Sequence, residues 1–308
     1  MSTSIENRLR FAPSPNGYLH LGHAYSALLN WSVADYVSGQ CLLRIEDIDQ
    51  SRFRPEYEAA IFEDLNWLGL DWLQSVLRQS ERFDAYQMAL DQLIRDELVY
   101  PAFLSRRDIS QKVSDIESSG PVWPKDPDGA PIYPGECRTL SNAERQSRID
   151  QGDAFNWRLD MKAAAARIKT ASGHDLSWTE LALPASGLDK ADPKLAETII
   201  KADPEQWGDV VLARRDVPTS YHLSVVLDDA MQDVNLIVRG TDLFASTSVH
   251  RVLQYLLQLP EPRYIHHKLI RDKNGRKLSK SDKDTSLREL RKTKGLTVQD
   301  IKKLIDFG

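Results

Sequence analysis

Residues 8–46 decide the fold of this chain and read RLRFAPSPNGYLHLGHAYSALLNWSVADYVSGQCLLRIE. Residues 8–12 alternate in the manner of a β-strand, which Pro13 ends because proline has no N–H to donate to a sheet. Apolar side chains then recur at helical spacing over residues 24–37. The short apolar run at residues 41–45 is typical of a buried parallel strand. The stretch therefore predicts a strand–helix–strand unit.

A right-handed crossover in this unit would place the loop at residues 13–22 and Glu46 together at the carboxyl ends of the two strands. Further along the chain, the same spacing rules predict helices over residues 56–68, 83–98 and 248–257 and in the polar tail at 282–308. They predict strands over residues 155–161, 210–214 and 235–239, of which the last two are expected to return to the main sheet. Prolines and glycines predict an irregular insertion at 118–137.

The composition limits the class of protein. A length of 308 residues suggests two domains, or one large α/β domain with an insertion. Hydrophobic residues at 41% and charged residues at 28% exclude a disordered or fibrous chain. The apolar runs are far shorter than the roughly 20 residues that span a bilayer, and residues 1–10 lack the apolar core of a signal peptide. Two cysteines cannot build a disulfide framework, so we expect a cytoplasmic protein without membrane association.

The charge is unevenly distributed. The whole chain carries a net charge of −5, which argues against a general nucleic-acid coat. Residues 263–303 nevertheless hold 14 Lys and Arg against 5 Asp and Glu. Such a basic stretch is typical of a solvated face and also of a segment that handles phosphate, and charge alone leaves both interpretations open.

Two histidines mark the most informative loop. His20 and His23 stand three residues apart where the loop enters the predicted helix. A helix N-terminus favours a bound phosphate, and imidazoles can donate hydrogen bonds to phosphoryl oxygens as charge develops. Gly22 has no side chain, so a flat ring could lie against the backbone there. The alternatives are a metal pair, for which no third ligand is nearby, and two surface histidines.

A second candidate for phosphate binding lies in the basic stretch. Lys277 and Lys280 stand three residues apart in the sequence KLSKS, shortly after Gly275. On a mobile loop, two such lysines could close over a polyphosphate and neutralise a leaving pyrophosphate. A pair of lysines at this spacing is common by chance, and it gains weight from the histidine loop about 250 residues upstream.

Both motifs resemble family signatures. HLGH at residues 20–23 and KLSKS at residues 277–281 resemble the HIGH and KMSKS signatures of class I aminoacyl-tRNA synthetases. RFAPSPNG at residues 10–17 and RIEDID at residues 44–49 resemble the glutamate-specific branch. The resemblance implies an α/β fold, with a Rossmann-type catalytic core, an inserted subdomain and a short helical C-terminal segment. The expected division is a first core half at 1–100, the insertion at 101–205, a second core half at 206–260 and the KMSKS loop with the helical segment at 261–308.

The tail after the second motif favours one branch of this family. The 27 residues at 282–308 are fewer than the roughly 100 that an anticodon-binding domain needs. The chain is therefore most similar to the truncated glutamyl-Q tRNA(Asp) synthetases. That resemblance implies that L-glutamate is activated with ATP, accompanied by Mg²⁺, and attached to queuosine in the anticodon of tRNA(Asp). The alternatives are a glutamyl-tRNA(Glu) synthetase without its anticodon domain and an inactive RNA-binding relative.

The resemblance also implies site residues. Each guanidinium of Arg10 and Arg239 could fork onto a carboxylate of glutamate, and Glu46 could hold its ammonium group. The full expected glutamate site comprises Arg10, Phe11, Ala12, Pro13, Ser14, Glu46, Tyr221 and Arg239. ATP is expected at His20, Gly22, His23 and Lys280, and catalysis at His20, His23, Lys277 and Lys280. The pair Asp228–Asp229 stays open between a structural and a functional role.

One departure from the family concerns zinc. Members often bind zinc through a Cys-x-Cys pair after Tyr-Pro and a later Tyr-x-x-x-Cys. Here residues 100–104 read YPAFL, so only Tyr133 and Cys137 of the four ligands remain. Two ligands cannot close a tetrahedral site, so we expect no zinc and, in its place, packing of residues 102–104. Cys41, inside an apolar strand, is interpreted as an inert core residue.

Overall fold

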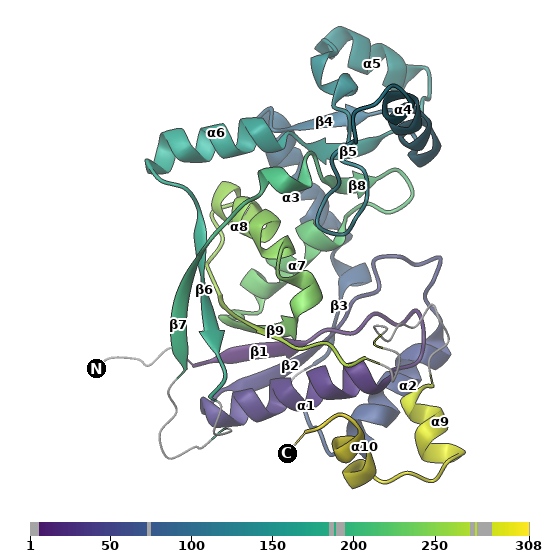
Figure 1. The fold of residues 1–308 in the computed structure, drawn as a ribbon, viewed down its shortest axis with the longest axis vertical. Helices are drawn as coiled ribbons and strands as arrows, with labels where there is room; N and C mark the ends of the chain where they lie inside the picture. Colours follow the sequence, from purple (N-terminus) through teal and green to yellow (C-terminus); the bar gives the residue numbers. More distant parts are fainter. Residues whose placement is uncertain are drawn as a thin grey trace.

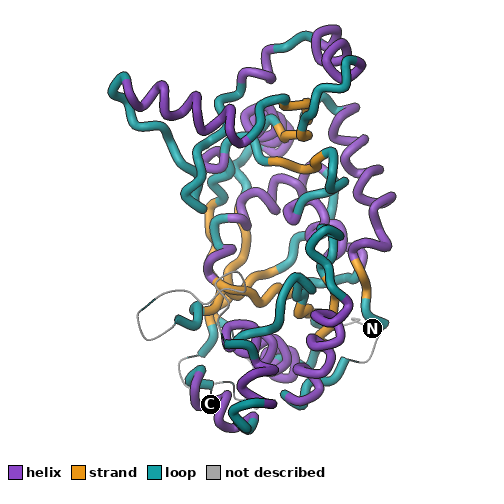
Figure 2. Tube along the Cα trace, turned by 90° about the vertical axis from the view of Figure 1, so that its right-hand side faces the viewer, coloured by secondary structure: helices purple, strands orange, loops and turns teal. Residues whose placement is uncertain are grey.

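The first three strands form a parallel sheet, and one helix lies along a face of this sheet (Figures 1 and 2). The computed structural model describes residues 6–72, 75–184, 188, 195–271, 275 and 285–307. Strands β1 (Arg8–Phe11), β2 (Gln40–Ile45) and β3 (Leu77–Arg78) pair in parallel in the order β1-β2-β3. Helix α1 (Leu21–Tyr36) connects β1 with β2 and confirms the predicted strand–helix–strand unit. Helix α2 (Pro55–Trp67) follows β2.

A second group of strands continues this layer. Strands β9 (Leu236–Gly240), β10 (Arg263–His267) and β6 (Ser177–Ala182) are parallel, and β7 (Ala196–Lys201) pairs antiparallel with β6. The two groups meet where the Asn235 backbone N–H donates to the Arg8 carbonyl oxygen at 3.1 Å. The combined order is β3-β2-β1-β9-β10-β6-β7, so the winding reverses between β1 and β9. This arrangement is a doubly wound sheet.

Alternating side chains give the sheet two different faces. One face carries Leu9, Leu43 and Val238, which pack with α1 in one hydrophobic core. The other face carries Leu42 and Ile237, which pack with α7 (Tyr221–Met231) and α8 (Ser246–Leu256) in a second core. Figure 1 shows α1 on one side of β1 and β9 and helices α7 and α8 on the other. Because side chains alternate along a strand, four polar residues share the α7–α8 face: Arg10, Arg44, Arg239 and His266.

A smaller sheet stands apart from this layer. Strands β4 (Val99–Ala102), β5 (Asn156–Leu159) and β8 (Val211–Arg214) pair antiparallel in the order β4-β5-β8. The expectation that residues 210–214 return to the main sheet was therefore wrong, whereas the one for residues 235–239 is confirmed. A short apolar run predicts a strand but does not specify which neighbour it pairs with. The division of the chain at residues 100, 205 and 260 stays a prediction.

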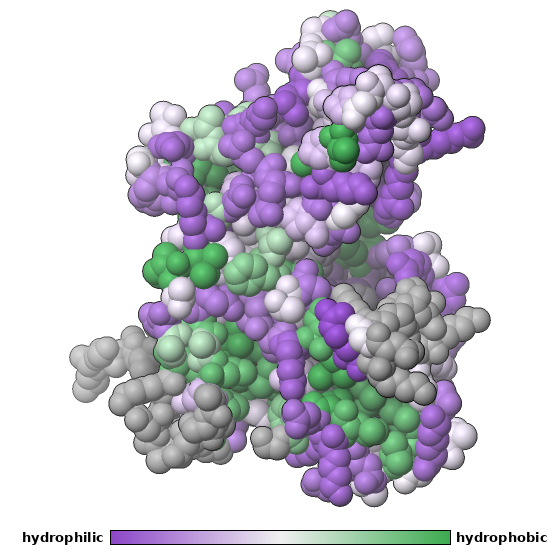
Figure 3. All heavy atoms as spheres, viewed as in Figure 1, coloured by the Kyte–Doolittle hydropathy of each residue, from purple (hydrophilic) through white to green (hydrophobic). Residues whose placement is uncertain are grey.

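Helices surround the small sheet. They are α3 (Phe83–Arg95), α4 (Arg106–Ser118), α5 (Asn142–Asp150) and α6 (Met161–Ser172). Short 3₁₀ turns lie at Gln79–Arg82, Glu136–Thr139, Glu205–Trp207 and Thr241–Leu243. In the view of Figure 3, polar side chains dominate the half of the molecule that carries α4, α5 and α6, whereas apolar ones gather on the half that carries α1.

Residues 102–104, where we expect packing in place of zinc, belong to a small separate core. Ala102 and Phe103 are buried in it together with Tyr133 and Cys137, and Leu104 packs against them. The Phe103 backbone N–H donates to the Cys137 Sγ atom at 3.3 Å. Within the part of the chain that the structure describes, no group of three or more His, Cys, Asp or Glu side chains could hold a metal ion. Packing thus occupies the positions at which the family's cysteine pair would stand.

The C-terminal helices pack beside the first loop. Helices α9 (Leu287–Lys292) and α10 (Val298–Leu304) pack against α2 and α1. The Leu287 backbone N–H donates to the Leu19 carbonyl oxygen at 2.7 Å, and the Arg291 guanidinium lies 3.1 Å from the buried Asp64 carboxylate. The tail is therefore attached beside the loop that carries His20. A search of the described residues finds no helix with the length and apolarity to cross a bilayer.

Candidate active site

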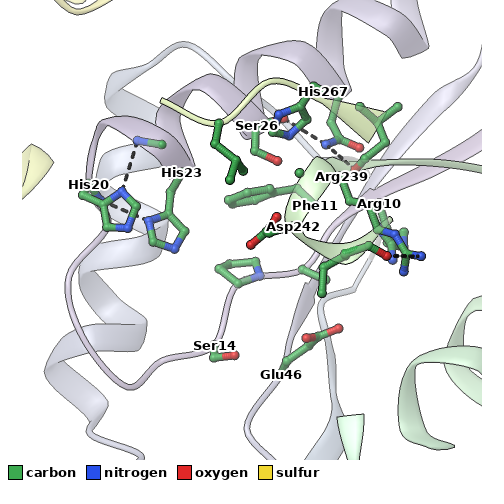
Figure 4. Close-up of a pocket in the computed structure, with 18 of the residues that line it drawn as sticks. Arg10, Phe11, Ser14, His20, His23, Ser26, Glu46, Arg239, Asp242 and His267 are labelled. Atoms are coloured by element: carbon green, nitrogen blue, oxygen red, sulfur yellow. Dashed lines mark hydrogen bonds between the residues drawn. The ribbon is translucent and has the colours of Figure 1, made fainter. Parts of the chain in front are cut away.

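A cavity of about 480 Å³ opens at the carboxyl ends of β1 and β9, where the winding of the sheet reverses (Figure 4). Open α/β sheets bind ligands at this position. The Glu46 backbone N–H donates to the Pro13 carbonyl oxygen at 3.1 Å, so the loop and Glu46 meet as the crossover predicts. The cavity is lined by eleven of the predicted site residues, namely Arg10, Phe11, Ala12, Pro13, Ser14, His20, Gly22, His23, Glu46, Tyr221 and Arg239. Lys277 and Lys280 lie outside the described residues.

The β1 side of the cavity is a balanced cluster of charges. The Asp229 carboxylate accepts from the Arg10 Nε atom at 2.9 Å and from the Arg44 Nη1 atom at 2.8 Å. Arg44 also lies 3.2 Å from the Glu46 carboxylate. Burial opposes ionisation of Asp229, but the two guanidinium groups outweigh it and hold its pKa below the usual value. Two arginines and two carboxylates therefore compensate one another in a buried place.

The open question about Asp228 and Asp229 is answered by their contacts. Both lie on α7 and are buried. The Asp228 carboxylate accepts from Gln79 at 2.8 Å, from Arg82 at 2.8 Å and from the Tyr86 hydroxyl at 2.8 Å. Asp228 therefore joins α7 to the start of α3, whereas Asp229 fixes the Arg10 guanidinium at the cavity wall.

The β9 side holds a buried cation of a different kind. The Arg239 guanidinium is buried and donates to four neutral acceptors: His266 Nε2 at 3.1 Å, His250 Nδ1 at 3.0 Å, Thr247 Oγ1 at 2.7 Å and the Leu243 carbonyl oxygen at 3.2 Å. Among the residues that the structure describes, no carboxylate lies within 4.0 Å of this guanidinium. In the described part of the chain, its charge is therefore held by dipoles and contacts no carboxylate.

The glutamate-facing candidates Glu46 and Tyr221 are also perturbed by burial. Burial raises the pKa of Glu46, although the Arg44 and Arg10 guanidinium groups oppose that shift. Burial likewise raises the pKa of Tyr221, whose ring lies 5.6 Å from the His250 ring. Tyr221 begins α7, directly after the capping residue Ser220. The tyrosine hydroxyl is therefore a neutral donor at the wall between the two charged clusters.

The two loop histidines cap their own helix. His20 is the N-cap of α1, and its Nδ1 atom accepts from the Gly22 backbone N–H at 3.1 Å. The His23 Nδ1 atom accepts from the His20 backbone N–H at 3.2 Å. Each neutral ring therefore carries its proton on Nε2. The N-terminus of α1 is thus capped by the His20 side chain, and His23 bonds back to the cap.

Gly22 makes room for one of these rings. A Cβ atom at residue 22 would lie 3.0 Å from the His20 Cε1 atom and 3.2 Å from its Nδ1 atom. The sequence interpretation assigned this space to a ligand ring lying against the backbone. On this side of Gly22 the space is taken by the His20 imidazole, whose centroid lies 3.9 Å from that of His23.

Some residues that line or support the site escaped the sequence analysis. Arg44 supports the cluster on the β1 side, and its charge inside the apolar run at 41–45 was a signal that could have indicated a buried partner. Asp242 follows β9 and His267 is the last residue of β10, and both line the cavity (Figure 4). The acceptors around Arg239 come from two other elements, Thr247 and His250 from α8 and His266 from β10, so no local pattern connects them with Arg239 on β9.

The comparisons with known proteins agree with this geometry. The family model described as "tRNA synthetases class I (E and Q), catalytic domain" matches residues 6–171 and 189–304. A Rhodobacter capsulatus protein named "Glutamyl-Q tRNA(Asp) synthetase" is 43% identical over 96% of this chain and 98% of its own length. "Glutamate--tRNA ligase 2" of Syntrophus aciditrophicus is 31% identical over 94% of this chain and 54% of its own length.

A solved structure extends the agreement to three dimensions. The glutamate-tRNA synthetase of Elizabethkingia anophelis superposes with a TM-score of 0.68 at 25% identity, over 90% of this chain and 53% of that one. The chain thus spans about half the length of the glutamate–tRNA ligases that it matches and nearly all of the R. capsulatus protein. On this evidence, the chain belongs to the class I tRNA synthetases of the glutamate and glutamine branch.

Proposed function

We propose that this protein activates L-glutamate with ATP and transfers the glutamyl group to queuosine in the anticodon of tRNA(Asp). The observation that carries the proposal is the cavity itself, which is lined by an unneutralised guanidinium, a carboxylate and a pair of histidines. The name of the R. capsulatus relative supports the choice of tRNA(Asp) and queuosine. The two-cysteine composition is compatible with a reducing cytoplasm as the site of this reaction.

The charges of glutamate match the two sides of the cavity. We assign the side-chain carboxylate of glutamate to Arg239, because this buried cation meets only neutral acceptors among the described residues. The ammonium group is assigned to Glu46, and Arg10, which is buried and lines the cavity, is assigned to the α-carboxylate. Residues 11–14 and Tyr221 would line the remaining walls. Each ionic group of the substrate then faces a group of opposite charge.

The first chemical step needs no protein nucleophile. An oxygen of the α-carboxylate attacks the α-phosphorus of ATP, and the bond to the β-phosphate oxygen breaks to release pyrophosphate. We assign His20 and His23, whose Nδ1 atoms accept from backbone N–H groups, to donate through Nε2–H to phosphoryl oxygens. Lys280, with Lys277, is proposed to neutralise the leaving pyrophosphate from the segment outside the described residues. We expect Mg²⁺ to arrive with the nucleotide, because Mg²⁺ usually binds through substrate phosphates and waters together with one or two carboxylates.

The second step transfers the glutamyl group. A queuosine hydroxyl attacks the carbonyl carbon of glutamyl-adenylate, the bond to the phosphate oxygen breaks, AMP leaves, and the hydroxyl proton passes to solvent or to AMP. Catalysis of both steps then rests on positioning and electrostatic stabilisation.

A second candidate function is glutamyl-tRNA(Glu) synthesis, which the 31% identity to the S. aciditrophicus ligase favours.

An acceptor assay separates the two functions. Labelled glutamate and ATP are offered with queuosine-containing tRNA(Asp), the same tRNA without queuosine, and tRNA(Glu). We expect label only on the first, in the anticodon fragment after ribonuclease digestion. Label at the 3′ end of tRNA(Glu) would establish the second candidate instead. Absence of glutamate-dependent pyrophosphate exchange would indicate an inactive relative.

A further inference from the structure

We propose that His250 and His266 are specificity-determining positioning residues, which hold Arg239 through neutral acceptors, without a carboxylate of the described residues in contact, so that the carboxylate of the ligand serves as the counterion of its charge. The inference rests on the proposed function, because it takes that ligand to be glutamate. It goes beyond a role for Arg239 itself, since neither histidine lines the cavity.

The hydrogen bonds fix the proton on each ring. A guanidinium can only donate, so the His250 Nδ1 and His266 Nε2 atoms that face Arg239 must both be acceptors. The proton of His266 then lies on Nδ1, which donates to the Glu180 carboxylate at 2.8 Å. The proton of His250 lies on Nε2, which faces the His222 Nδ1 atom at 3.2 Å. Each imidazole is thus neutral and held in a single tautomer.

Both rings are kept neutral by their surroundings. Burial, and the nearby Arg239 charge, hold the pKa of His250 well below the usual value. Burial also lowers the pKa of His266, although the Glu180 carboxylate opposes that shift. A protonated ring would turn a donor toward the Arg239 donor and break the contact. The two imidazoles can therefore position the Arg239 guanidinium only while both rings are neutral.

The His266 imidazole lies between the Glu180 carboxylate and the Arg239 guanidinium. Its carboxylate accepts from the His266 backbone N–H at 2.9 Å, from His266 Nδ1 and from the Trp178 indole N–H at 3.1 Å. This carboxylate orients the imidazole without touching the guanidinium. Its position differs from that of Asp229, which contacts Arg10 directly at 2.9 Å. The same sheet face thus carries one arginine that has a protein anion and one that has a protein dipole shell.

An unneutralised buried cation favours an anionic ligand over a neutral one of the same shape. Burying a charge without a partner is costly, and a ligand carboxylate removes that cost when it binds. Glutamine, which replaces the side-chain carboxylate by an amide, leaves the charge unpaired. The neutral acceptors around Arg239 therefore select against glutamine, because any protein carboxylate in their place would neutralise the charge before the ligand arrives.

The test exchanges His250 for two side chains of equal shape and different charge. In His250→Asn the amide oxygen takes the place of the Nδ1 acceptor, and in His250→Asp a carboxylate stands at the same position. We expect the asparagine variant to bind glutamate within about 3-fold of the wild type. The aspartate variant should raise the KM for glutamate on the order of 30-fold or more, with the KM for ATP little changed and glutamine no longer discriminated. Equal glutamate KM values for the two variants would overturn the inference.

Folding is checked in the same experiment. The melting temperature of the aspartate variant should match or exceed that of the asparagine variant, because the new carboxylate neutralises a buried cation. Should the aspartate variant fail to fold, Thr247→Asp against Thr247→Asn places the same pair of groups at the other side of the guanidinium, where Thr247 Oγ1 accepts at 2.7 Å. The same contrast in glutamate affinity is expected there, and its absence would count against the proposal.

Thermal stabilisation by added glutamate separates this inference from the proposed function. It reports binding without chemistry, and we expect it for the wild type and His250→Asn but not for His250→Asp. A wild type that is stabilised by glutamate yet exchanges no pyrophosphate would contradict the proposed function alone. A wild type that glutamate does not stabilise would contradict both.

Discussion

The two sides of the cavity both bury arginine side chains, but they compensate the positive charges in opposite ways. On the β1 side, the buried Arg10 and Arg44 share the Asp229 carboxylate, and Arg44 also reaches Glu46. On the β9 side, the buried Arg239 meets two imidazoles, a hydroxyl and a carbonyl oxygen. The charges of the first cluster pair with one another inside the protein, whereas the second carries a charge that a ligand can still neutralise. Stability is therefore expected to depend more on the first cluster and recognition more on the second.

The largest expected effect is on stability, from the loss of the shared anion. Asp229→Asn leaves Arg10 and Arg44 buried without their carboxylate, which should lower the free energy of unfolding by about 3 kcal/mol. Urea denaturation at neutral pH measures it. The control is Asp233→Asn, since Asp233 pairs with Arg8 at the surface and should change stability by less than about 0.5 kcal/mol. Equal effects of the two substitutions would contradict the structural role of Asp229.

Arg239→Ala should mainly affect recognition. We expect the KM for glutamate to rise on the order of 100-fold, and the preference over glutamine to fall, because a charged hydrogen-bonding partner is lost. The KM for ATP should stay close to that of the wild type. Arg263→Ala, on the neighbouring strand β10, is the control because Arg263 is 43% exposed. A glutamate KM unchanged by Arg239→Ala would show that this arginine pairs with something other than the substrate.

Mild acid should distinguish the two clusters. Burial lowers the pKa of His222 to about 4, whereas in the unfolded chain it titrates near 6.5. Between these values the unfolded chain binds more protons than the folded one, so stability is full above pH 6.5 and declines toward pH 4. Asp229, with a depressed pKa, loses its contribution only at lower pH.

Stability measured by urea denaturation at several pH values tests this difference. Replacement of His222 by Asn keeps an acceptor at the Nδ1 position and removes the titrating group. The variant should therefore show a shallower decline of stability between pH 6.5 and pH 4.5 than the wild type. Parallel declines for the two proteins would assign the acid sensitivity to other groups.

The smallest expected effect is that of a chelator. EDTA should leave the melting temperature unchanged, because Ala102, Phe103 and Leu104 pack where a zinc site would otherwise couple metal binding to folding. Elemental analysis of the purified protein should find no stoichiometric zinc. One zinc per chain, together with a lower melting temperature in EDTA, would require ligands that the packing does not suggest.

Local patterns predicted most of the first half of the site. The alternation at residues 8–12 and the helical spacing that follows gave β1 and α1, and the handedness of the crossover brought Glu46 to the Pro13 carbonyl. The helix begins at Leu21, three residues before the apolar spacing starts, because His20 caps it. Imidazole capping is a local hydrogen bond that hydrophobic periodicity does not contain.

The supports of the site could not be predicted in the same way. The ring of acceptors around Arg239 comes from β10 and α8, and the anion shared by Arg10 comes from α7, 219 residues away. Such partners are chosen by the packing of the sheet and not by neighbours in the chain. The misplacement of residues 211–214 has the same origin, since an apolar run specifies a strand but not its partner.

The most direct test of this account is calorimetric titration of the wild-type protein with glutamate and with glutamine under identical conditions. The two ligands have nearly the same shape and differ in one side-chain charge. If the side-chain carboxylate of glutamate neutralises the Arg239 charge, glutamine should bind at least about 100-fold more weakly than glutamate. Equal dissociation constants for the two ligands would contradict the claim that the β9 side of the cavity recognises charge.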